Sequence, residues 1–193
     1  MRKATHNEKN LIINILTRSF DKNQSVNYII KQDKKRLTRI SALMAYSFEV
    51  CYLFGQVYLS DDNRACALLL YPHTKKTTVK SVLLDVELMF KCIGFSNLNK
   101  AINRESVIEK IQPKERKCYL WFIGVDPEYQ SLGTGTSLLT EIIDENEKQA
   151  LPLYLETSTL RNLPFYQKFG FKVYDELDLS YKLFFLKRDP YKS

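Results

Sequence analysis

LWFIGVDPEYQSLGTGT, residues 120–136, carries the strongest structural signal in this chain. It contains an apolar strand, a turn at Asp126-Pro127, a loop with Gly133 and Gly135, and the start of an amphipathic helix. The first N–H groups of a helix have no intrahelical partner, and the helix dipole favours anions at that end. Because the two glycines carry no Cβ, a phosphate group can approach the main chain there. The stretch therefore predicts an anion site between a strand and a helix.

Two well-known phosphate loops fit this stretch poorly. A Walker loop needs a Lys after its last glycine, and this chain has Thr136 there. The dinucleotide fingerprint needs a third glycine, whereas position 138 is Leu, and its acidic ribose partner has no clear counterpart. A tight strand-to-helix turn, with glycines present only for packing, is the structural alternative.

Two motifs match one family better. Gln130-x-x-Gly133-x-Gly135 resembles the acetyl-CoA-binding motif of the GNAT N-acetyltransferase superfamily. Downstream, NLPFYQKFGF (residues 162–171) resembles the second signature of that family, an aromatic-Tyr pair followed by Gly-Phe. The resemblance covers residues 117–186 firmly and the earlier part loosely. It implies an α/β fold with a mixed, mostly antiparallel sheet, a central splay between two strands, and helices on both faces.

The order of predicted elements agrees with that fold. Thr5 and Glu8 form a capping-box pattern before a helix, and a second helix after Asp33 ends at Gly55. The expected apolar stripe of the second helix is Leu37, Ile40, Leu43, Met44, Phe48 and Cys51. The remaining predictions are strands at 2–5, 56–60, 65–71, 117–125, 153–156, 171–177 and 180–188, and helices at 133–148 and 163–169.

Residues 77–109 are read as a helical pair inserted before the motif strand. Apolar residues recur there at helical spacing: Val82, Leu83, Val86, Met89, Phe90 and Ile93. A second helical piece is expected from Asn97 to Ile111. We expect this insertion, together with residues 43–48, to wall the acceptor pocket; a purely scaffolding role is the alternative.

A length of 193 residues fits one domain, and the resemblance implies that residues 1–193 form a single N-acetyltransferase domain. The longest apolar run, residues 65–71, is too short for a membrane span, and the N-terminal residues are polar, so a cytoplasmic location without membrane contact is expected. The four cysteines are widely spaced and only two histidines exist, so reduced buried thiols and no metal are expected. The net charge of +7 includes a basic run at residues 31–39. A solvated helix face explains this run better than nucleic-acid binding does.

The resemblance also implies a set of cofactor contacts. Ile123 and Val125 would offer main-chain groups to the pantetheine arm, beside Gly124, which suits a bulge or a close backbone approach. The loop N–H groups would bind the pyrophosphate, and the Thr136 hydroxyl would add one bond; this loop comprises Gln130, Ser131, Leu132, Gly133, Thr134, Gly135 and Thr136. The family usually has an Asn seven residues before the motif tyrosine, where this chain has Thr159. Asn162 in the same loop is the alternative partner of the cofactor arm.

Acetyl transfer to an amine needs a proton donor for the departing thiolate and a proton acceptor for the amine. The resemblance places Tyr166 as the donor; aromatic core is its structural alternative. Glu156 ends the strand beside the expected splay and is the candidate base, ahead of Glu49 and Glu128. A water chain without a single base is equally compatible with the family.

Three functions compete at this stage. The first is acetyl-CoA-dependent N-acetyltransfer to a primary amine of a small molecule or peptide. The second is a catalytically silent acyl-CoA-binding regulatory module, and the third is nucleic-acid binding through residues 31–39. The amine acceptor, the acyl-chain preference, the physiological role and the oligomeric state, homodimer included, stay open.

Overall fold

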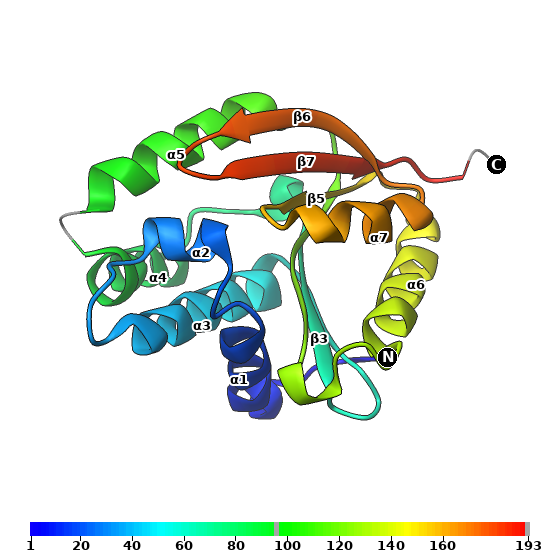
Figure 1. The fold of residues 1–193 in the computed structure, drawn as a ribbon, viewed down its shortest axis with the longest axis horizontal. Helices are drawn as coiled ribbons and strands as arrows, with labels where there is room; N and C mark the ends of the chain where they lie inside the picture. Colours follow the sequence, from blue (N-terminus) through cyan, green and yellow to red (C-terminus); the bar gives the residue numbers. More distant parts are fainter. Residues whose placement is uncertain (95–96, 192–193) are drawn as a thin grey trace.

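The computed structural model describes residues 1–94 and 97–191. Within these residues, seven strands form one sheet in the order β1-β2-β3-β4-β5-β7-β6 (Figure 1). The strands are β1 (Arg2–Lys3), β2 (Gly55–Leu59), β3 (Ala65–Leu70), β4 (Cys118–Val125), β5 (Leu153–Thr157), β6 (Lys172–Asp178) and β7 (Lys182–Arg188). The pair β4–β5 is parallel and all other neighbours are antiparallel. The predicted mixed, mostly antiparallel α/β fold is confirmed.

The helices are α1 (Lys9–Ser19), α2 (Gln24–Ile29), α3 (Arg36–Phe54), α4 (Val79–Leu88), α5 (Leu98–Ile111), α6 (Thr134–Glu147) and α7 (Leu163–Lys168). Short 3₁₀ helices are η1 (His6–Glu8), η2 (Pro72–Thr74), η5 (Pro127–Tyr129) and η6 (Leu160–Asn162), and η3 (Met89–Ile93) is a π-helical segment that continues α4. The expected capping box is present, because the Thr5 N–H donates to the Glu8 carboxylate at 2.7 Å. The helix α2 was not predicted from the sequence, and Asn23 caps it by accepting from the Val26 N–H at 3.0 Å.

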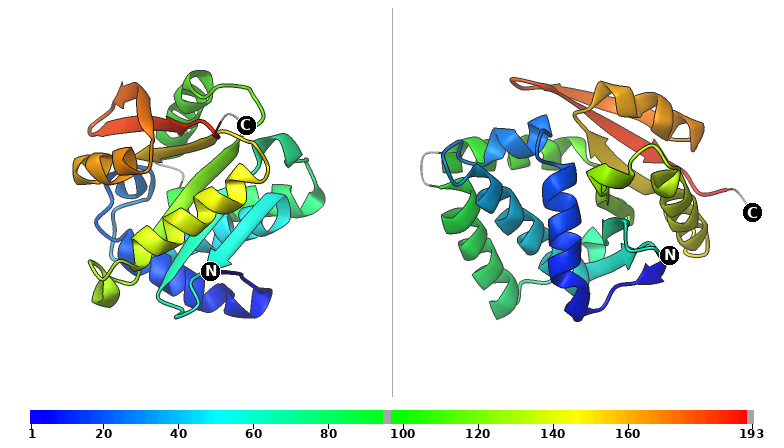
Figure 2. Two further views of the ribbon diagram at one scale, coloured as in Figure 1. Left: turned by 90° about the vertical axis from the view of Figure 1, so that its right-hand side faces the viewer. Right: turned by 60° about the horizontal axis from the view of Figure 1, so that its bottom comes forward.

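Helices cover both faces of the sheet. One core cluster joins α1 and α3 to the sheet, with Ile12, Leu16 and Phe48 fully enclosed. A second cluster joins α6 and α7 to the opposite face. Figure 2 shows α6 across one face, with α1 behind the sheet. A third cluster packs α5 against β7. The site is therefore built where three packed layers meet.

The two strands that carry the motifs separate soon after they begin to pair. Residues of β4 and β5 pair only at Cys118↔Leu153 and Tyr119↔Tyr154. Beyond Tyr119, β4 pairs with β3 alone, and its register with β3 shifts by one residue opposite the step from Leu68 to Leu69. The predicted central splay is thus present in the structure.

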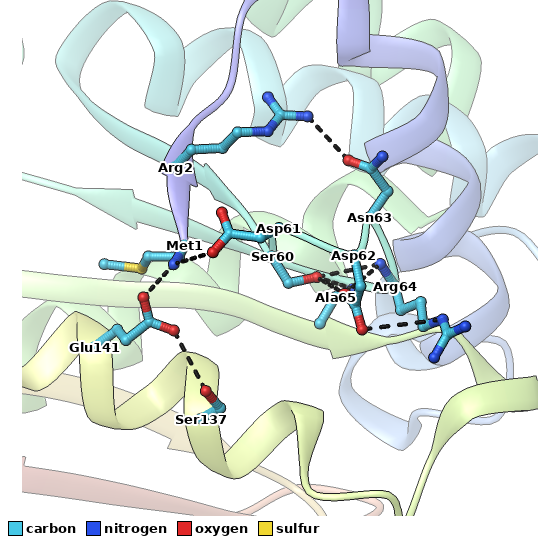
Figure 3. A network of polar contacts seen from close by, with 10 residues as sticks. All are labelled: Met1, Arg2, Ser60, Asp61, Asp62, Asn63, Arg64, Ala65, Ser137 and Glu141. Carbon is cyan, nitrogen blue, oxygen red and sulfur yellow. Dashed lines mark hydrogen bonds and ion pairs between the residues drawn. The ribbon is translucent and has the colours of Figure 1, made fainter.

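The N-terminal strand and the β2–β3 turn are joined to α6 by polar contacts (Figure 3). The Met1 amino group lies between the carboxylates of Asp61, at 3.2 Å, and Glu141 of α6. Within the turn, the Ser60 hydroxyl accepts from the Ala65 N–H at 2.9 Å. These contacts attach the start of the sheet to the helix that follows the motif loop.

The insertion is helical, as predicted, but most of its apolar stripe is not buried. Val82, Leu83 and Val86 of α4 are exposed, while Cys92 and Ile93 are buried. Leu37, predicted on the buried stripe of α3, is also exposed. Helical periodicity identifies a helix and its apolar side but does not show whether another element covers that side.

Gly55 is required at the junction of α3 and β2. A Cβ at this position would lie 1.9 Å from the Leu69 carbonyl oxygen. We predict that Gly55→Ala lowers the free energy of unfolding by about 3 kcal/mol or more, because backbone must move. Gly133→Ala is the control: a Cβ there meets no described heavy atom within 4 Å, and its left-handed conformation costs about 1 kcal/mol. Urea unfolding measures both; equal losses would contradict the steric explanation.

Candidate active site

The loop between β4 and α6 presents a run of free N–H groups. Gly133 takes a left-handed conformation (φ 87°) as the N-cap of α6, and Ser131 also has a positive φ of 64°. In the part of the chain that the structure describes, the backbone N–H groups of residues 130–136 have no hydrogen-bond acceptor. The first later donor is Ser137, which donates to the Gly133 carbonyl at 3.0 Å. Free N–H groups in a loop that leads into a helix N-terminus are suited to an anion, and anion binding at this loop stays a prediction.

The helix α1 contacts the start of this loop through Arg18. Arg18 donates to the carboxylates of Asp126, at 2.9 Å, and Glu128, at 2.6 Å. On the other side of the turn, the Arg64 guanidinium stacks over the Tyr129 ring at 4.2 Å. Charged hydrogen bonds at both ends of the proline turn fix the start of the loop relative to the sheet. Glu128, a weaker candidate base in the sequence, is thus an ion-pair partner of Arg18.

Gly124 and Gly135, the two glycines nearest the gap between β4 and β5, are needed for different structural reasons. A Cβ on Gly124 would lie 3.0 Å from Leu16 and 3.1 Å from the Ser19 hydroxyl, so this glycine allows α1 to approach β4 closely. The expected close approach is present, whereas the strand irregularity lies earlier in β4, near Trp121. A Cβ on Gly135 would lie 3.2 Å from a Val125 methyl carbon, so bulk here would fill the space between the loop and the strand end.

The main-chain groups of Ile123 and Val125 lie on the edge of β4 that faces the gap toward β5. The Asp126 N–H donates to the Arg64 carbonyl at 2.8 Å, and main-chain groups alternate between the edges of an antiparallel strand. The groups of Ile123 and Val125 therefore point away from β3. The Val125 carbonyl, however, already accepts from the Ser19 hydroxyl at 2.7 Å and from the Gln130 side chain at 3.2 Å. The carbonyl expected to meet the cofactor arm is thus shared with the protein.

Tyr166 lies on α7 in an apolar environment. It is 7% exposed and makes edge contacts with the rings of Phe165 and Phe171. Its hydroxyl donates to no described residue. Burial raises the pKa of Tyr166 to about 12, because the charged phenolate would be poorly solvated. The hydroxyl therefore keeps its proton throughout the neutral pH range.

Glu156 lies on the opposite face of β5. Leu153 and Leu155 belong to the core cluster beneath α6 and α7, so strand alternation places Glu156 on the face covered by α5. Its carboxylate accepts from the Gln112 side chain at 2.7 Å. Burial raises the pKa of Glu156 to about 7, and the hydrogen bond from Gln112 is the largest opposing effect. A carboxyl group that titrates near neutral pH can both take and release a proton.

The remaining predicted residues have simpler positions. Thr159 precedes η6, and its carbonyl accepts from the Asn162 N–H at 2.9 Å. Both side chains are half-buried and bond to no described residue. The Thr136 side chain is exposed at the loop. Glu49 is buried on α3, where it pairs with Lys9 at 2.7 Å and Lys80 at 3.0 Å, away from the loop.

Four residues around Glu156 were missed by the sequence analysis. Gln112 and the buried Lys117 lie on the stretch between α5 and β4, and Tyr119 lies on β4 with its hydroxyl facing Glu156. Arg104 of α5 is 8% exposed and donates to the Tyr181 hydroxyl at 3.0 Å. A lysine that opens an apolar strand was the one sequence signal for this polar cluster.

Other features of the molecule lie outside this site. A surface cavity of about 440 Å³ between α6 and the end of α7 is lined by Thr140, Lys168 and Arg188, among others, but by no residue of the motif loop. In the basic run, Arg39 pairs with Asp33 at 2.7 Å and Arg36 pairs with Asp21. The four cysteines are free and buried. Among the described helices, none is long and apolar enough to span a membrane.

Comparison with known proteins finds a matching family model for part of the chain. Residues 88–173 match the model of the acetyltransferase (GNAT) domain. An uncharacterized N-acetyltransferase of Schizosaccharomyces pombe is 38% identical over 61 residues, which cover 30% of this chain and 25% of that protein. The chain thus matches about a quarter of the length of this curated relative.

Solved structures agree in fold. A Corynebacterium glutamicum structure, described as histone acetyltransferase HPA2 and related acetyltransferase, superposes with a TM-score of 0.72 at 16% identity, covering 100% of this chain and 96% of the other. The ribosomal-protein-S18-alanine N-acetyltransferase of Escherichia coli gives 0.55 at 15% identity, with coverages of 100% and 94%. Residues 88–173 thus match the GNAT acetyltransferase family, in agreement with the sequence motifs, and the solved structures show the same fold over the whole chain.

The titration of Glu156 makes stability depend on pH. Its pKa is about 7 in the folded protein and near the ordinary 4.5 when unfolded, so the folded state binds the proton more tightly and stability is lost as pH rises from 4.5 through 7. We predict that Glu156→Gln, which cannot ionise, gains about 1–3 kcal/mol over wild type between pH 4 and pH 8.

Glu115→Gln is the control of opposite sign. A hydrogen bond from Tyr154 lowers the pKa of Glu115, so its contribution to stability is present above the unfolded pKa and is lost as pH falls. Chemical unfolding at several pH values measures both differences. A stability difference for Glu156→Gln that does not change with pH would show that the carboxyl group titrates normally.

Proposed function

We propose that this protein transfers an acetyl group directly from acetyl-CoA to a primary amine of a small molecule or peptide, with residues 1–193 acting as one N-acetyltransferase domain. The observation that carries the proposal is the run of seven free N–H groups at the start of α6, next to two strands that have separated. The N–H groups suit a pyrophosphate, and the separated strands leave unpaired main-chain groups for an amide-containing arm. Acetyl-CoA supplies both, together with an activated acetyl group.

The loop and the splayed strand would bind the cosubstrate in the following way. The N–H groups of Gln130 to Thr136 would surround the pyrophosphate, and the Thr136 hydroxyl would add a donor. Ile123 would offer its main-chain groups to the pantetheine arm without competition, whereas Val125 would offer mainly its N–H, because Ser19 and Gln130 bond its carbonyl. Asn162 and Thr159 have side chains with free polar groups beside α7, and either supports the arm from that face.

The two candidate catalytic groups approach the splay from opposite faces. Tyr166 belongs to the cluster under α6 and α7, and Glu156 faces α5. The acceptor nitrogen would give its proton to Glu156, bond to the acetyl carbon as the carbon–sulfur bond breaks, and leave a thiolate that takes the Tyr166 proton. The high pKa of Tyr166 keeps that proton available, and the pKa of about 7 makes Glu156 an effective base at neutral pH. Solvent then restores both groups.

The acceptor would enter from the side of α5. Leu83 of α4 and Phe90 of η3, which were expected over the pocket, are 62% and 56% exposed, so these residues do not enclose Glu156. Arg104 and Gln112, from α5 and its C-terminal end, surround the carboxylate instead. The expected wall of the acceptor pocket is therefore assigned to α5.

The cosubstrate assignment is tested at Gly135. In Gly135→Val the new Cβ would lie 3.2 Å from a Val125 methyl carbon, so the side chain would crowd Val125. It would also cover the N–H groups of the loop. We predict at least a tenfold loss of acetyl-CoA affinity by calorimetry, about 1.4 kcal/mol. Thr140→Val, on an exposed position of the same helix, is the control for folding and should bind normally. Unchanged affinity in a folded Gly135→Val protein would remove the loop from the cofactor site.

The reaction itself is tested by thiol release from acetyl-CoA over a panel of amines. Tyr166→Phe keeps the ring and its packing but removes the proton donor, so turnover should fall about 100-fold while acetyl-CoA affinity barely changes. Tyr58→Phe is the matched control, because Tyr58 is similarly buried in the same core cluster. Normal turnover in Tyr166→Phe refutes its role as the acid. Binding without thiol release from any amine would favour a regulatory acyl-CoA-binding module.

A further inference from the structure

A chain of three side chains connects the insertion to Glu156. Lys117 donates from Nζ to the Gln112 Oε1 atom at 3.0 Å and to the Pro113 carbonyl at 2.8 Å. Gln112 in turn donates from Nε2 to a Glu156 carboxylate oxygen at 2.7 Å. Because Gln112 directly follows the last residue of α5, the chain joins the inserted helix, the start of β4 and the end of β5.

The lysine sets the direction of the glutamine amide. An ammonium group can only donate hydrogen bonds, so the amide oxygen of Gln112 must face Lys117 and the amide NH₂ must face Glu156. The opposite orientation would place NH₂ against an ammonium and oxygen against a carboxylate. Lys117 is 4% exposed and lies 5.3 Å from the Tyr154 ring centre, so its own position is fixed by packing. Gln112 therefore always presents a donor to Glu156.

We infer that Gln112, oriented by Lys117, is a positioning residue that holds the Glu156 carboxylate in place for proton removal from the acceptor amine. The inference rests on the proposed function, because it takes Glu156 as the base. Gln112 does not touch the reacting atoms; it acts through the carboxylate that it binds.

The charges around Glu156 explain why this hydrogen bond matters. Arg104 on α5 favours the ionised carboxylate and Glu105 on the same helix opposes it. Lys117, which directly precedes β4, Tyr119 of β4 and Tyr174 of β6 face the same carboxylate. Burial is the dominant effect and favours the neutral acid, and the Gln112 bond is the strongest single influence against it. Removing that bond leaves burial less opposed.

Gln112→Leu tests the inference directly. The pKa of Glu156, followed by carbon NMR of the glutamate side chains and assigned with Glu156→Gln, should rise from about 7 by roughly one pH unit or more. The ionised fraction at pH 7 then falls from about one half to about one tenth, so kcat/KM for the amine should fall about fivefold at pH 7 and recover at higher pH. The KM for acetyl-CoA should not change.

Two further variants keep the test decisive. Gln112→Glu has nearly the same shape and still accepts from Lys117, but it places a second carboxylate against Glu156. The pKa of Glu156 should therefore rise further than in Gln112→Leu. Gln149→Leu is the matched control, since among the described residues the Gln149 side chain bonds only the Tyr71 hydroxyl, at 3.0 Å, and its loss should leave the titration and the rate unchanged.

The outcomes separate this inference from the proposed function. An unchanged pKa of Glu156 in folded Gln112→Leu and Gln112→Glu proteins overturns the positioning role. A raised pKa with an unshifted pH–rate profile shows that Gln112 controls the ionisation of Glu156 but that Glu156 is not the base, which overturns the catalytic part of the inference. Acetyl transfer itself is judged separately, by thiol release in the wild-type protein.

Discussion

The separation of β4 from β5 after two paired residues is the constraint on which the rest of the site depends. A continuous parallel ladder would have used the main-chain groups of Ile123 and Val125 within the sheet. Instead, those groups face the gap, and the chain compensates part of the cost with the Ser19 hydroxyl and the Gln130 side chain, both bonded to the Val125 carbonyl. The same strand end leads directly into the loop of free N–H groups, so the opening in the sheet and the anion site are fixed relative to each other by one segment.

Burial acts on both candidate catalytic groups, with opposite chemical consequences. It raises the pKa of Tyr166 away from neutrality, which keeps the hydroxyl protonated, and raises the pKa of Glu156 to about 7, which brings that carboxyl group into the working range. The difference lies in the starting values and in the neighbours. Tyr166 is surrounded by aromatic rings, whereas Glu156 has a polar cluster that restrains the effect of burial.

The sequence was sufficient for the parts of the fold that local rules determine. The capping box at Thr5, the end of α3 at Gly55 and the left-handed Gly170 all follow from nearby residues, and each is present. The glycine loop and Tyr166 were found because the family motifs are contiguous. The exposed stripe on α4 could not be predicted, because amphipathic spacing does not reveal which element covers a helix.

The polar cluster around Glu156 could not be predicted from the sequence for a related reason. Gln112 and Glu156 are separated by 44 residues, and nothing local to either predicts that they meet. Gln112 follows a helix and precedes a proline, which describes a loop equally well. The bond from Ser19 to Val125, across 106 residues, was hidden in the same way. Contacts of this kind are decided by the packing of α1 and α5 on the sheet, and so appear only in three dimensions.

The position of β7 has a consequence for how the chain folds as it is synthesised. β7 lies between β5 and β6, although it follows both in sequence. β6 has no other strand partner among the described residues, so it cannot join the sheet until Arg188 has been made. Glu156 and its neighbours on β5 also lack their strand partner until β7 has been made, because β5 pairs with β7 from Leu153 to Thr157. Long-range pairing of this kind slows folding, and it leaves the exposed edge of β5 in need of protection until the last strand arrives.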